Sequence, residues 1–271
     1  EVKLNAHQIV DDEFYDIQRW TGSTEIQKVL NFDDYLIDFQ GGTGLDLYSI
    51  KGRPAHDDND NKYIDRLSLA FAISASKQFT NSFNNYDLFV EPKIQIASMH
   101  ATNRTEEVPN RDSTNYRIDS SNLFLLNHFQ GRDNIQNNQR INAGIETFIS
   151  SENVGDINFF VGQSQRIGGS ESGLINTYDR QSDFITDLNW QFSESHDLNL
   201  SALLDNHSLK QNYSNVTLNG NISGINYSTS FRSIKDKLVS DNKDREELAI
   251  GLNKNYKNWN FGYNNVYDLS N

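Results

Sequence analysis

The chain has 271 residues and a formal net charge of −13, with Lys+Arg 24 against Asp+Glu 37. This acidic balance argues against nucleic-acid binders, which neutralise phosphates with a basic surface. The lack of cysteine excludes disulfide frameworks, thiolate metal sites and cysteine nucleophiles. A mean hydropathy of −0.69 and the lack of long apolar runs exclude membrane-spanning helices. They do not exclude a membrane β-barrel, because its strands show only every second residue to lipid.

Alternating polarity is the dominant pattern along the chain. It is first clear at residues 67–76, where Leu67, Leu69, Phe71 and Ile73 alternate with small, mostly polar residues. A period of two residues is typical of strands with one apolar and one wet face. No segment sustains a helical stripe, so the predicted fold class is all-β and antiparallel. The same pattern returns at 86–96, 141–149, 184–192, 198–204, 225–231, 248–252 and 259–263.

Short connectors alternate with long polar ones. Residues 81–84 and 194–196 are short connectors, whereas 53–62, 103–120 and 168–181 are long. About 14 strands, with short turns on one side and long loops on the other, predict an up-and-down outer-membrane β-barrel, incomplete in this chain. The alternation is also compatible with a soluble β-sandwich or β-solenoid, in which it would mean core-in and solvent-out. No internal repeat of fixed period supports the solenoid.

The alternation also assigns the two faces of the segment at 67–76. In a barrel, one face of each strand meets lipid and the other meets the lumen, and a slip of one residue would invert both faces. We expect Leu69, Phe71 and Ile73 to face lipid, and Ser68, Ala72 and Ser74 to face the lumen.

The sequence supports no catalytic or metal-binding motif. Ser74–Lys77 matches S-x-x-K and Ser240–Asn242 matches S-D-N of the serine acyl-enzymes, but K-T-G is missing and Ser74 lies inside a strand pattern. Asp57–Asn61 begins like a calcium-binding loop but lacks the later glycine and bidentate glutamate. The histidines include no pair at zinc-ligand spacing. We therefore predict no catalytic residue, no metal and no cofactor.

One region has a specific sequence. Residues 108–113 read VPNRDS, and residues 120–146 read SSNLFLLNHFQGRDNIQNNQRINAGIE. Together they resemble the central motif of the LptD (OstA/Imp) family of lipopolysaccharide-assembly proteins, in which I-P-N-x-D-S precedes D-x-x-N-L-F-x-x-N-R-F-x-G-x-D-R. Segments at 86–97, 159–167 and 182–192 resemble family strands in the same order. The resemblance covers residues 86–206 and is faint before residue 67.

Three positions depart from the family motif. His128 replaces the usual arginine, Asn134 replaces the arginine of the D-R pair, and Ala143 stands where tyrosine is common. These departures put in doubt any role of the missing arginines as lumenal cations.

The matching motif positions are the candidate site residues, as structural or lumenal-loop positions. Around three of them, apolar residues gather in a polar context at Leu123, Phe124, Leu125, Leu126 and Phe129. A solvated loop would expose this patch to water, so we expect residues 120–131 to be an ordered loop folded into or across the barrel mouth, packed against the lumenal wall or a partner. The full set is Pro109, Asn110, Asp112, Ser113, Asn122, Leu123, Phe124, Asn127, Phe129, Gly131, Asp133, Arg140, Gly144, Gly162, Gln163 and Ser164.

The resemblance implies a transporter and not an enzyme. By this resemblance, residues 1–271 are part of an outer-membrane barrel of a Gram-negative bacterium, without the family's N-terminal jellyroll. The implied function is insertion of lipopolysaccharide into the outer leaflet. The implied partners are the LptE lipoprotein plug, lipopolysaccharide, outer-membrane lipid and the periplasmic Lpt bridge, reached through the missing N-terminal domain. A porin-like barrel, which would lack the paired motif, and a soluble carbohydrate-binding β-protein remain as alternatives.

Overall fold

The structure, a computed structural model, describes residues 2–11, 15–51, 62–102, 107–108, 110–113, 117–170, 177–178, 180–235, 238 and 243–270. Of residues 2–11, 15–16 and 51 it describes the backbone. Pro109, the calcium-loop match at Asp57–Asn61 and the S-D-N match at Ser240–Asn242 lie outside the described residues.

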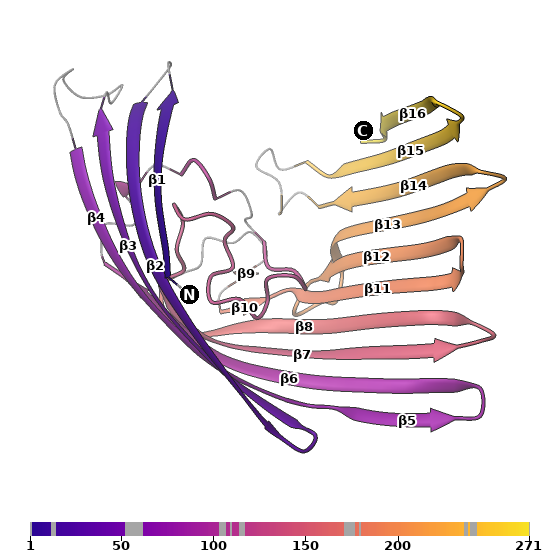
Figure 1. Cartoon of the computed structure of the whole chain (residues 1–271), viewed down its shortest axis with the longest axis horizontal. Coiled ribbons are helices and arrows are strands. Elements are labelled where there is room, and N and C mark those ends of the chain that lie inside the picture. Colours follow the sequence, from indigo (N-terminus) through magenta and orange to yellow (C-terminus); the bar gives the residue numbers. More distant parts are fainter. Residues whose placement is uncertain are drawn as a thin grey trace.

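The described chain forms one antiparallel sheet (Figure 1). Within it, no helix is long and apolar enough to cross a membrane. The strands are β1 (Val2–Asp11), β2 (Tyr15–Phe32), β3 (Tyr35–Lys51), β4 (Lys62–Lys77), β5 (Phe79–Phe83), β6 (Tyr86–Ala101), β7 (Asn138–Ser151), β8 (Gly155–Gly169), β9 (Thr177–Tyr178), β10 (Gln181–Ser182), β11 (Phe184–Ser193), β12 (His196–Leu204), β13 (Gln211–Ile222), β14 (Ile225–Ile234), β15 (Arg245–Tyr256) and β16 (Trp259–Asp268).

Neighbours in the sheet are mostly neighbours in the sequence. The main path runs β1-β2-β3-β4-β6-β7-β8-β11-β12-β13-β14-β15-β16, and the short strands β5, β9 and β10 pair beside it. These short strands explain why the 16 strands of the sheet exceed the expectation of about 14. In the described part of the chain, the edge strands β1 and β16 do not pair with each other, so the sheet is open.

The sheet is strongly curved. In Figure 1, β1–β4 stand on one side, and β6–β16 form the floor and the opposite side. The segment between β6 and β7 lies on the concave side, between the two. Short hairpin turns such as Ser223–Gly224, where both residues have positive φ (53° and 76°), close one end of the sheet. This pair of left-handed residues matches the right-handed twist of the flanking strands.

The two faces of β4 have opposite polarity, as predicted. Phe71 is 49% exposed on the convex face, together with Leu69 and Ile73. Ala72 and Ser74 on the concave face are 0% and 2% exposed, and Ser68 is also buried there. A soluble sandwich would bury its apolar rows, whereas here the apolar row is the exposed one. The fold is thus the outer-membrane barrel type of all-β sheet, with an apolar outer band and a polar inner face.

The exposed position of Phe71 generates a prediction for the protein in a bilayer. Phe71→Arg is expected to lower the free energy of unfolding by about 2–4 kcal/mol if residue 71 lies near the bilayer midplane. The measurement is denaturant unfolding of the full-length protein reconstituted in lipid vesicles. Phe71→Leu, which keeps the position apolar, is the control. Equal stability of the arginine variant and the control would place Phe71 away from lipid.

Candidate functional site

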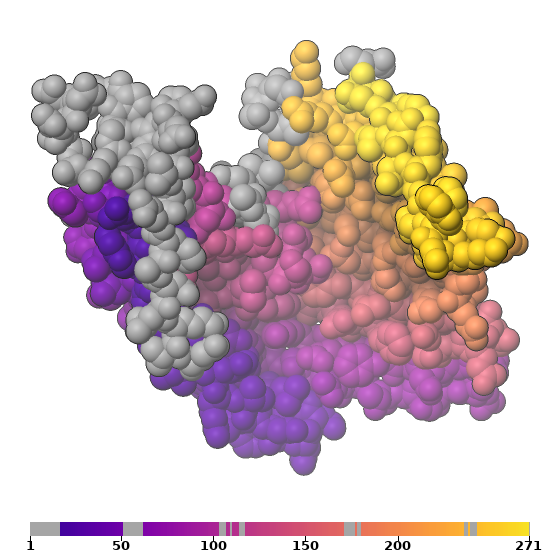
Figure 2. Space-filling view, turned by 45° about the horizontal axis from the view of Figure 1, so that its top comes forward, coloured from indigo at the N-terminus to yellow at the C-terminus, as the bar shows by residue number. Residues whose placement is uncertain are grey.

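The candidate site is the segment between β6 and β7, here called the inner loop (residues 107–108, 110–113 and 117–137). Its atoms lie between the indigo and violet arm formed by β2–β4 and the orange and yellow strands of the opposite wall (Figure 2). The sequence predicted an ordered loop over 120–131, folded into or across the barrel mouth. The structure places these residues on the concave side of the open sheet (Figure 1).

Apolar side chains pack one half of the inner loop against the sheet. Leu123 is fully buried, which fits the prediction that this cluster turns away from water. Leu125, however, is 52% exposed, so the expectation is wrong for this member of the cluster. The buried cluster joins Ile118, Leu123 and Phe129 of the loop to Ile185 of β11, Leu203 of β12, Tyr213 of β13 and Leu238.

Asp133 is the centre of the contacts that hold the other half of the loop. Its Oδ1 accepts hydrogen bonds from the Arg19 guanidinium at 2.8 Å and from the Tyr48 hydroxyl at 3.2 Å. Its Oδ2 accepts the backbone N–H groups of Arg111 at 2.8 Å and Asp112 at 3.1 Å. Both carboxylate oxygens are therefore satisfied, which a buried charge requires.

Asp112 shares the same arginine. Its Oδ2 lies 2.6 Å from Nη1 of Arg19, and its Oδ1 accepts the backbone N–H groups of Arg132 and Asp133 at 3.0 and 2.9 Å. Burial raises the pKa of the Asp112 carboxyl, but the backbone N–H groups and Arg19 outweigh burial and lower it to about 2. The inner loop is thus held by the carboxylates of Asp112 and Asp133, and that of Asp112 stays ionised at neutral pH.

Arg66 of β4 binds the loop backbone. Its side chain is completely buried and donates to Oδ2 of Asp46 at 2.8 Å and to the carbonyl oxygen of Asp133 at 2.6 Å. It also donates to the carbonyl oxygen of Arg132. We call Arg19, Asp46, Arg66, Asp112 and Asp133 the charge anchor, because together they join β2, β3 and β4 to the loop.

Arg140 at the start of β7 holds the middle of the inner loop. It is 1% exposed, and its Nη2 donates to the carbonyl oxygens of Leu125 and Leu126, both at 2.7 Å. Nε2 of Gln95 on β6 donates to the carbonyl oxygen of Phe124 at 2.9 Å. These donors satisfy loop carbonyls that would otherwise be buried without a partner.

Asparagine side chains bridge the turns within the loop. Asn122 Nδ2 donates to the carbonyl oxygens of Arg117 at 2.9 Å and His128 at 3.0 Å. Asn127 Nδ2 donates to the carbonyl oxygen of Asn134 at 3.0 Å. Short amide side chains can replace missing backbone partners in this way, so the loop keeps one shape without regular secondary structure.

Three further motif positions set the local turns. Asn110 and Ser113 exchange hydrogen bonds at 3.0 Å, and the Ser113 hydroxyl accepts the N–H of Asn134 at 2.9 Å. Gly131 has φ +86°, and a Cβ there would lie 2.4 Å from the carbonyl oxygen of Asp112. Glycine is therefore required where the two loop segments cross.

His128 is a neutral structural residue and not a lumenal cation. Burial lowers its pKa well below the usual value, the charge of Arg140 lowers it further, and the hydrogen bond to Leu123 opposes both only in part. Its Nε2 lies 3.0 Å from the carbonyl oxygen of Leu123, so the ring donates from this nitrogen. Neutral histidine thus fills the position where the family motif has arginine.

Gly144 of β7 and Gly162 of β8 make room for the loop. They are paired across the two strands on the concave face. A Cβ on Gly144 would lie 2.9 Å from the ring of Phe160, and one on Gly162 would lie 2.5 Å from Leu123 Cδ2 and 2.8 Å from Phe160. Because neither glycine has a side chain, the sheet has a depression at this point, and Leu123 packs into it.

Gln163 and Ser164 do not join the inner loop. Gln163 Nε2 donates to the carbonyl oxygen of Ser182 at 3.0 Å, and the N–H of Ser164 donates to the Ser182 hydroxyl at 2.9 Å. They bind β10 instead. The other described motif positions lie in the loop or directly beneath it.

Sequence analysis missed the sheet half of the charge anchor. Arg19, Asp46, Tyr48 and Arg66 lie outside the motif, in strands where the family resemblance was faint. Their signal was weak but present: Arg66 occupies a buried concave-face position of β4, and the row that follows it, Ser68 to Ser76, holds only small residues. A charge on the buried face of a strand predicts a partner from elsewhere in the chain.

Where the structure describes the residues of the serine acyl-enzyme match and of possible metal sites, their arrangement does not support catalysis or metal binding. Ser74 lies in the middle of β4, where its hydroxyl accepts a hydrogen bond from Gln95 at 3.3 Å, and Lys77 binds the Tyr35 hydroxyl at 2.9 Å. Serine and lysine are thus not arranged as a nucleophile and its base. Among the described residues, no three histidine, aspartate or glutamate side chains could hold a metal ion.

Comparison with known families decides which family the chain belongs to. The model of the family described as LptD, LPS transport system D, matches residues 1–265. The chain belongs to the LptD family. The match includes the first 66 residues, where the sequence resemblance was faint, and so extends it to β1–β3. A comparison with curated proteins gave no match.

Membership assigns the general function. LptD proteins are outer-membrane proteins of lipopolysaccharide transport and assembly, and they are not a known enzyme family. The predicted family, fold class and transport function are therefore confirmed. Lipopolysaccharide is the substrate of this system, and the Lpt machinery is its setting.

The glycine depression generates a prediction about loop packing. Gly162→Ala is expected to destabilise the inner loop by about 1–3 kcal/mol, because a methyl group there overlaps Leu123 and Phe160. Hydrogen exchange of residues 118–129 in the full-length protein measures the effect. Gly262→Ala is the matched control, since a Cβ at this strand glycine has its nearest neighbour at 3.8 Å. Unchanged protection in the Gly162 variant would contradict the packing.

The lowered pKa of Asp112 generates a pH dependence. A carboxyl whose pKa falls on folding from 3.8 to about 2 stabilises the loop above pH 3.8, and this contribution is lost as the pH falls through about 2. Deuterium uptake by the described residues of 110–136, corrected for intrinsic exchange, should be flat at neutral and mildly acidic pH and rise below pH 3.8. In Asp112→Asn the acid-dependent rise should be smaller. Identical profiles for both proteins would refute this linkage.

Proposed function

We propose that residues 1–271 form part of the wall of a larger LptD barrel in the outer membrane of a Gram-negative bacterium, and that the inner loop is its internal plug. The saccharide of lipopolysaccharide passes the concave face while its lipid part meets the membrane. The observation that supports this proposal is the reversed polarity of the sheet together with a loop held on its polar face by buried ion pairs. A loop so anchored narrows the lumen without closing the outer surface.

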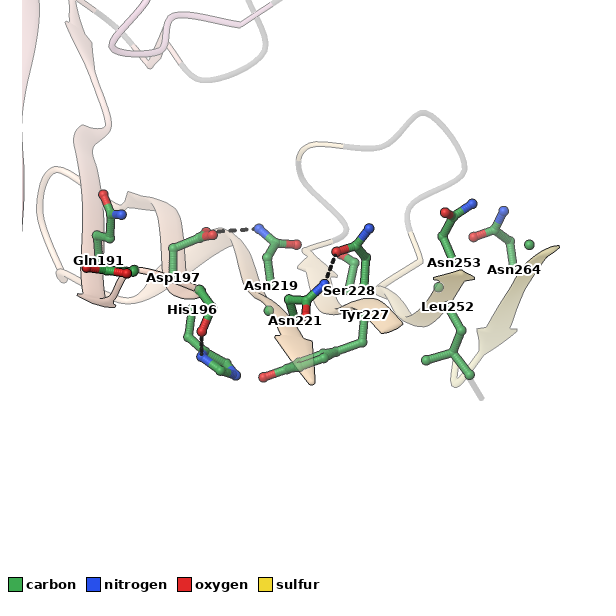
Figure 3. Close-up of a pocket in the computed structure, with 16 residues that line it drawn as sticks. Gln191, His196, Asp197, Asn219, Asn221, Tyr227, Ser228, Leu252, Asn253 and Asn264 are labelled. Atoms are coloured by element: carbon green, nitrogen blue, oxygen red, sulfur yellow. Dashed lines mark hydrogen bonds between the residues drawn. The ribbon is translucent and has the colours of Figure 1, made fainter. Parts of the chain in front are cut away.

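The LptE lipoprotein is the proposed occupant of the concave face that the inner loop leaves uncovered. This face belongs to the turn ends of β12–β16, and nearly all residues of β16 are exposed. Figure 3 shows that Asp197, Asn219, Asn253 and Asn264 project to one side of the strands, whereas Tyr227 projects to the other. The polar side lines a cavity of about 510 Å³. A hydrogen-bonding surface of this kind suits a folded polar partner.

The periplasmic Lpt bridge is proposed to reach this barrel through an N-terminal domain outside residues 1–271. Lipid of the outer membrane contacts the convex face, where Leu69, Phe71 and Ile73 are exposed. The motif residues of the inner loop act as structural and lumenal positions, and no catalytic role is proposed for them.

The plug is tested by weakening the charge anchor. Asp133→Asn keeps the side-chain shape but removes the charge that Arg19 pairs with, and breaking such a buried pair costs about 3–5 kcal/mol. We expect the full-length protein with LptE to conduct more ions across planar bilayers, and cells to admit large antibiotics. Asp34→Asn, in the exposed turn between β2 and β3, is the control. Hydrogen exchange shows whether the substitution has made the inner loop mobile. If the loop is mobile and the conductance of the variant is still unchanged, the proposal that the loop plugs the lumen is refuted.

A further inference from the structure

A polar groove follows β11 and β12 beneath the inner loop. Two cavities of about 440 and 180 Å³ share Ser120, Asp187 and Ser201 in their walls and so lie side by side. The next cavity towards the hairpin turns begins at Gln191 and Asp197. The groove therefore runs along the strands, from the loop end of the sheet towards its turn end.

Amide and hydroxyl groups line this groove in register. Asp187 is paired with Ser201 and Asn189 with Asn199 across the two strands, so their side chains lie on the same concave face. Asn199 Nδ2 donates to Asp197 at 2.5 Å, and Asn158 Nδ2 donates to Glu146 at 3.0 Å. Each amide keeps further hydrogen-bonding capacity. This repeated arrangement suits an extended ligand with many hydroxyl groups.

Aromatic rings form part of the same wall. Phe160 and Phe124 both line the larger cavity. Nζ of Lys93 lies 4.6 Å from the centroid of the Phe124 ring. Binding sites commonly combine apolar ring surface with a few placed polar groups. A sugar ring fits this combination because it has an apolar C–H face and a polar rim.

The net charge of the groove determines which charged or neutral groups a bound sugar can carry. The larger cavity has the carboxylates of Glu91, Glu146 and Asp187 against the cation of Lys93. The smaller cavity adds one carboxylate, Asp119, and one cation, Arg117, so the groove as a whole keeps an excess of negative charge. In the described part of the chain, the structure records no hydrogen bond or ion pair for the Asp187 carboxylate, so it can accept from a ligand. An excess of negative charge repels phosphate and carboxylate groups and favours hydroxyl and ammonium groups.

We propose that this groove binds neutral or amine-bearing saccharide units and rejects phosphorylated ones. This inference rests on the proposed passage of saccharide along the concave face and specifies which part of the glycan contacts the wall here. Asp187 accepts hydrogen bonds from sugar hydroxyl or ammonium groups, Ser201 and Asn199 bind the adjacent hydroxyls, and Phe160 contacts the apolar face of the ring.

The test measures oligosaccharide binding to the full-length protein with LptE in detergent, by saturation-transfer NMR. The probes are maltopentaose, a glucosamine pentasaccharide and a sulfated pentasaccharide. The neutral and amine probes are expected to bind and the sulfated probe is not. Asp187→Asn should weaken the glucosamine probe by about tenfold, the loss expected for one hydrogen bond to a charged group. Glu25→Gln, on the concave face of β2 across the loop, is the matched control and should bind like the wild type.

Equal affinity of Asp187→Asn and wild type, or preference for the sulfated probe, would overturn the inference. These outcomes would leave the proposed function intact if the same protein still exports lipopolysaccharide in cells. Normal lipopolysaccharide export in cells depleted of this protein would instead count against the proposed function.

The source of the saccharide is settled by a photo-crosslinking residue at Ser201 in growing cells. Adducts that react with antibody to lipopolysaccharide assign the groove to glycan in transit. Adducts formed only with added oligosaccharide assign it to capture from outside. Absence of both adducts, with the crosslinker active in control positions, would contradict the groove as a saccharide site.

Discussion

The buried guanidinium groups of Arg19 and Arg66 bind the inner loop, and most of the arrangement on the concave face depends on these contacts. A curved sheet with an apolar outer face must turn its polar residues inward, where arginine cannot stay buried without partners. Asp112 and Asp133 supply carboxylates, and the loop backbone supplies carbonyl oxygens. The sheet satisfies the loop in return, because Arg140 and Gln95 bind carbonyl oxygens in its middle. Neither part has its polar groups satisfied without the other.

Apolar packing fixes the other side of the inner loop. The paired glycines at 144 and 162 open a depression in β7 and β8, and Leu123 enters it. The apolar cluster around Leu123 and the charge anchor lie at opposite sides of the loop, so the loop spans the concave face between β2–β4 and β11–β13. A plug held at both sides can narrow a lumen and still leave polar space along β11 and β12.

Membership in the LptD family gives these features a common setting. A protein of lipopolysaccharide transport needs an outer surface that meets lipid and an inner surface that meets sugar and phosphate. The exposed apolar row of β4 meets the first need. The acidic and amide-rich groove meets only part of the second, because it favours neutral and amine-bearing groups over phosphates. In the proposed saccharide groove, negative charge would favour the neutral and amine-bearing units of the glycan, and the anionic part would follow a different route.

The sequence by itself determined the all-β fold class, many of the strands after residue 66 with their faces, and the family resemblance. Strand alternation is a local property with a period of two residues, so Phe71 and Ser74 could be assigned to opposite faces without knowledge of any neighbour. The motif between β6 and β7 could be identified because its residues are contiguous. The cluster around Leu123 could be expected to avoid water, although exposure of Leu125 could not be foreseen.

Only the tertiary structure decided which residues meet the loop. Arg19 and Asp133 are separated by 114 positions, and no local pattern relates them. The same holds for Gln163 and Ser164, which belong to the family motif but bind β10 rather than the loop. Local periodicity specifies which face a side chain occupies, whereas the partner on that face depends on how the sheet curves and where the loop folds back. That geometry arises from the whole sheet, and so the charge anchor became visible only in the folded chain.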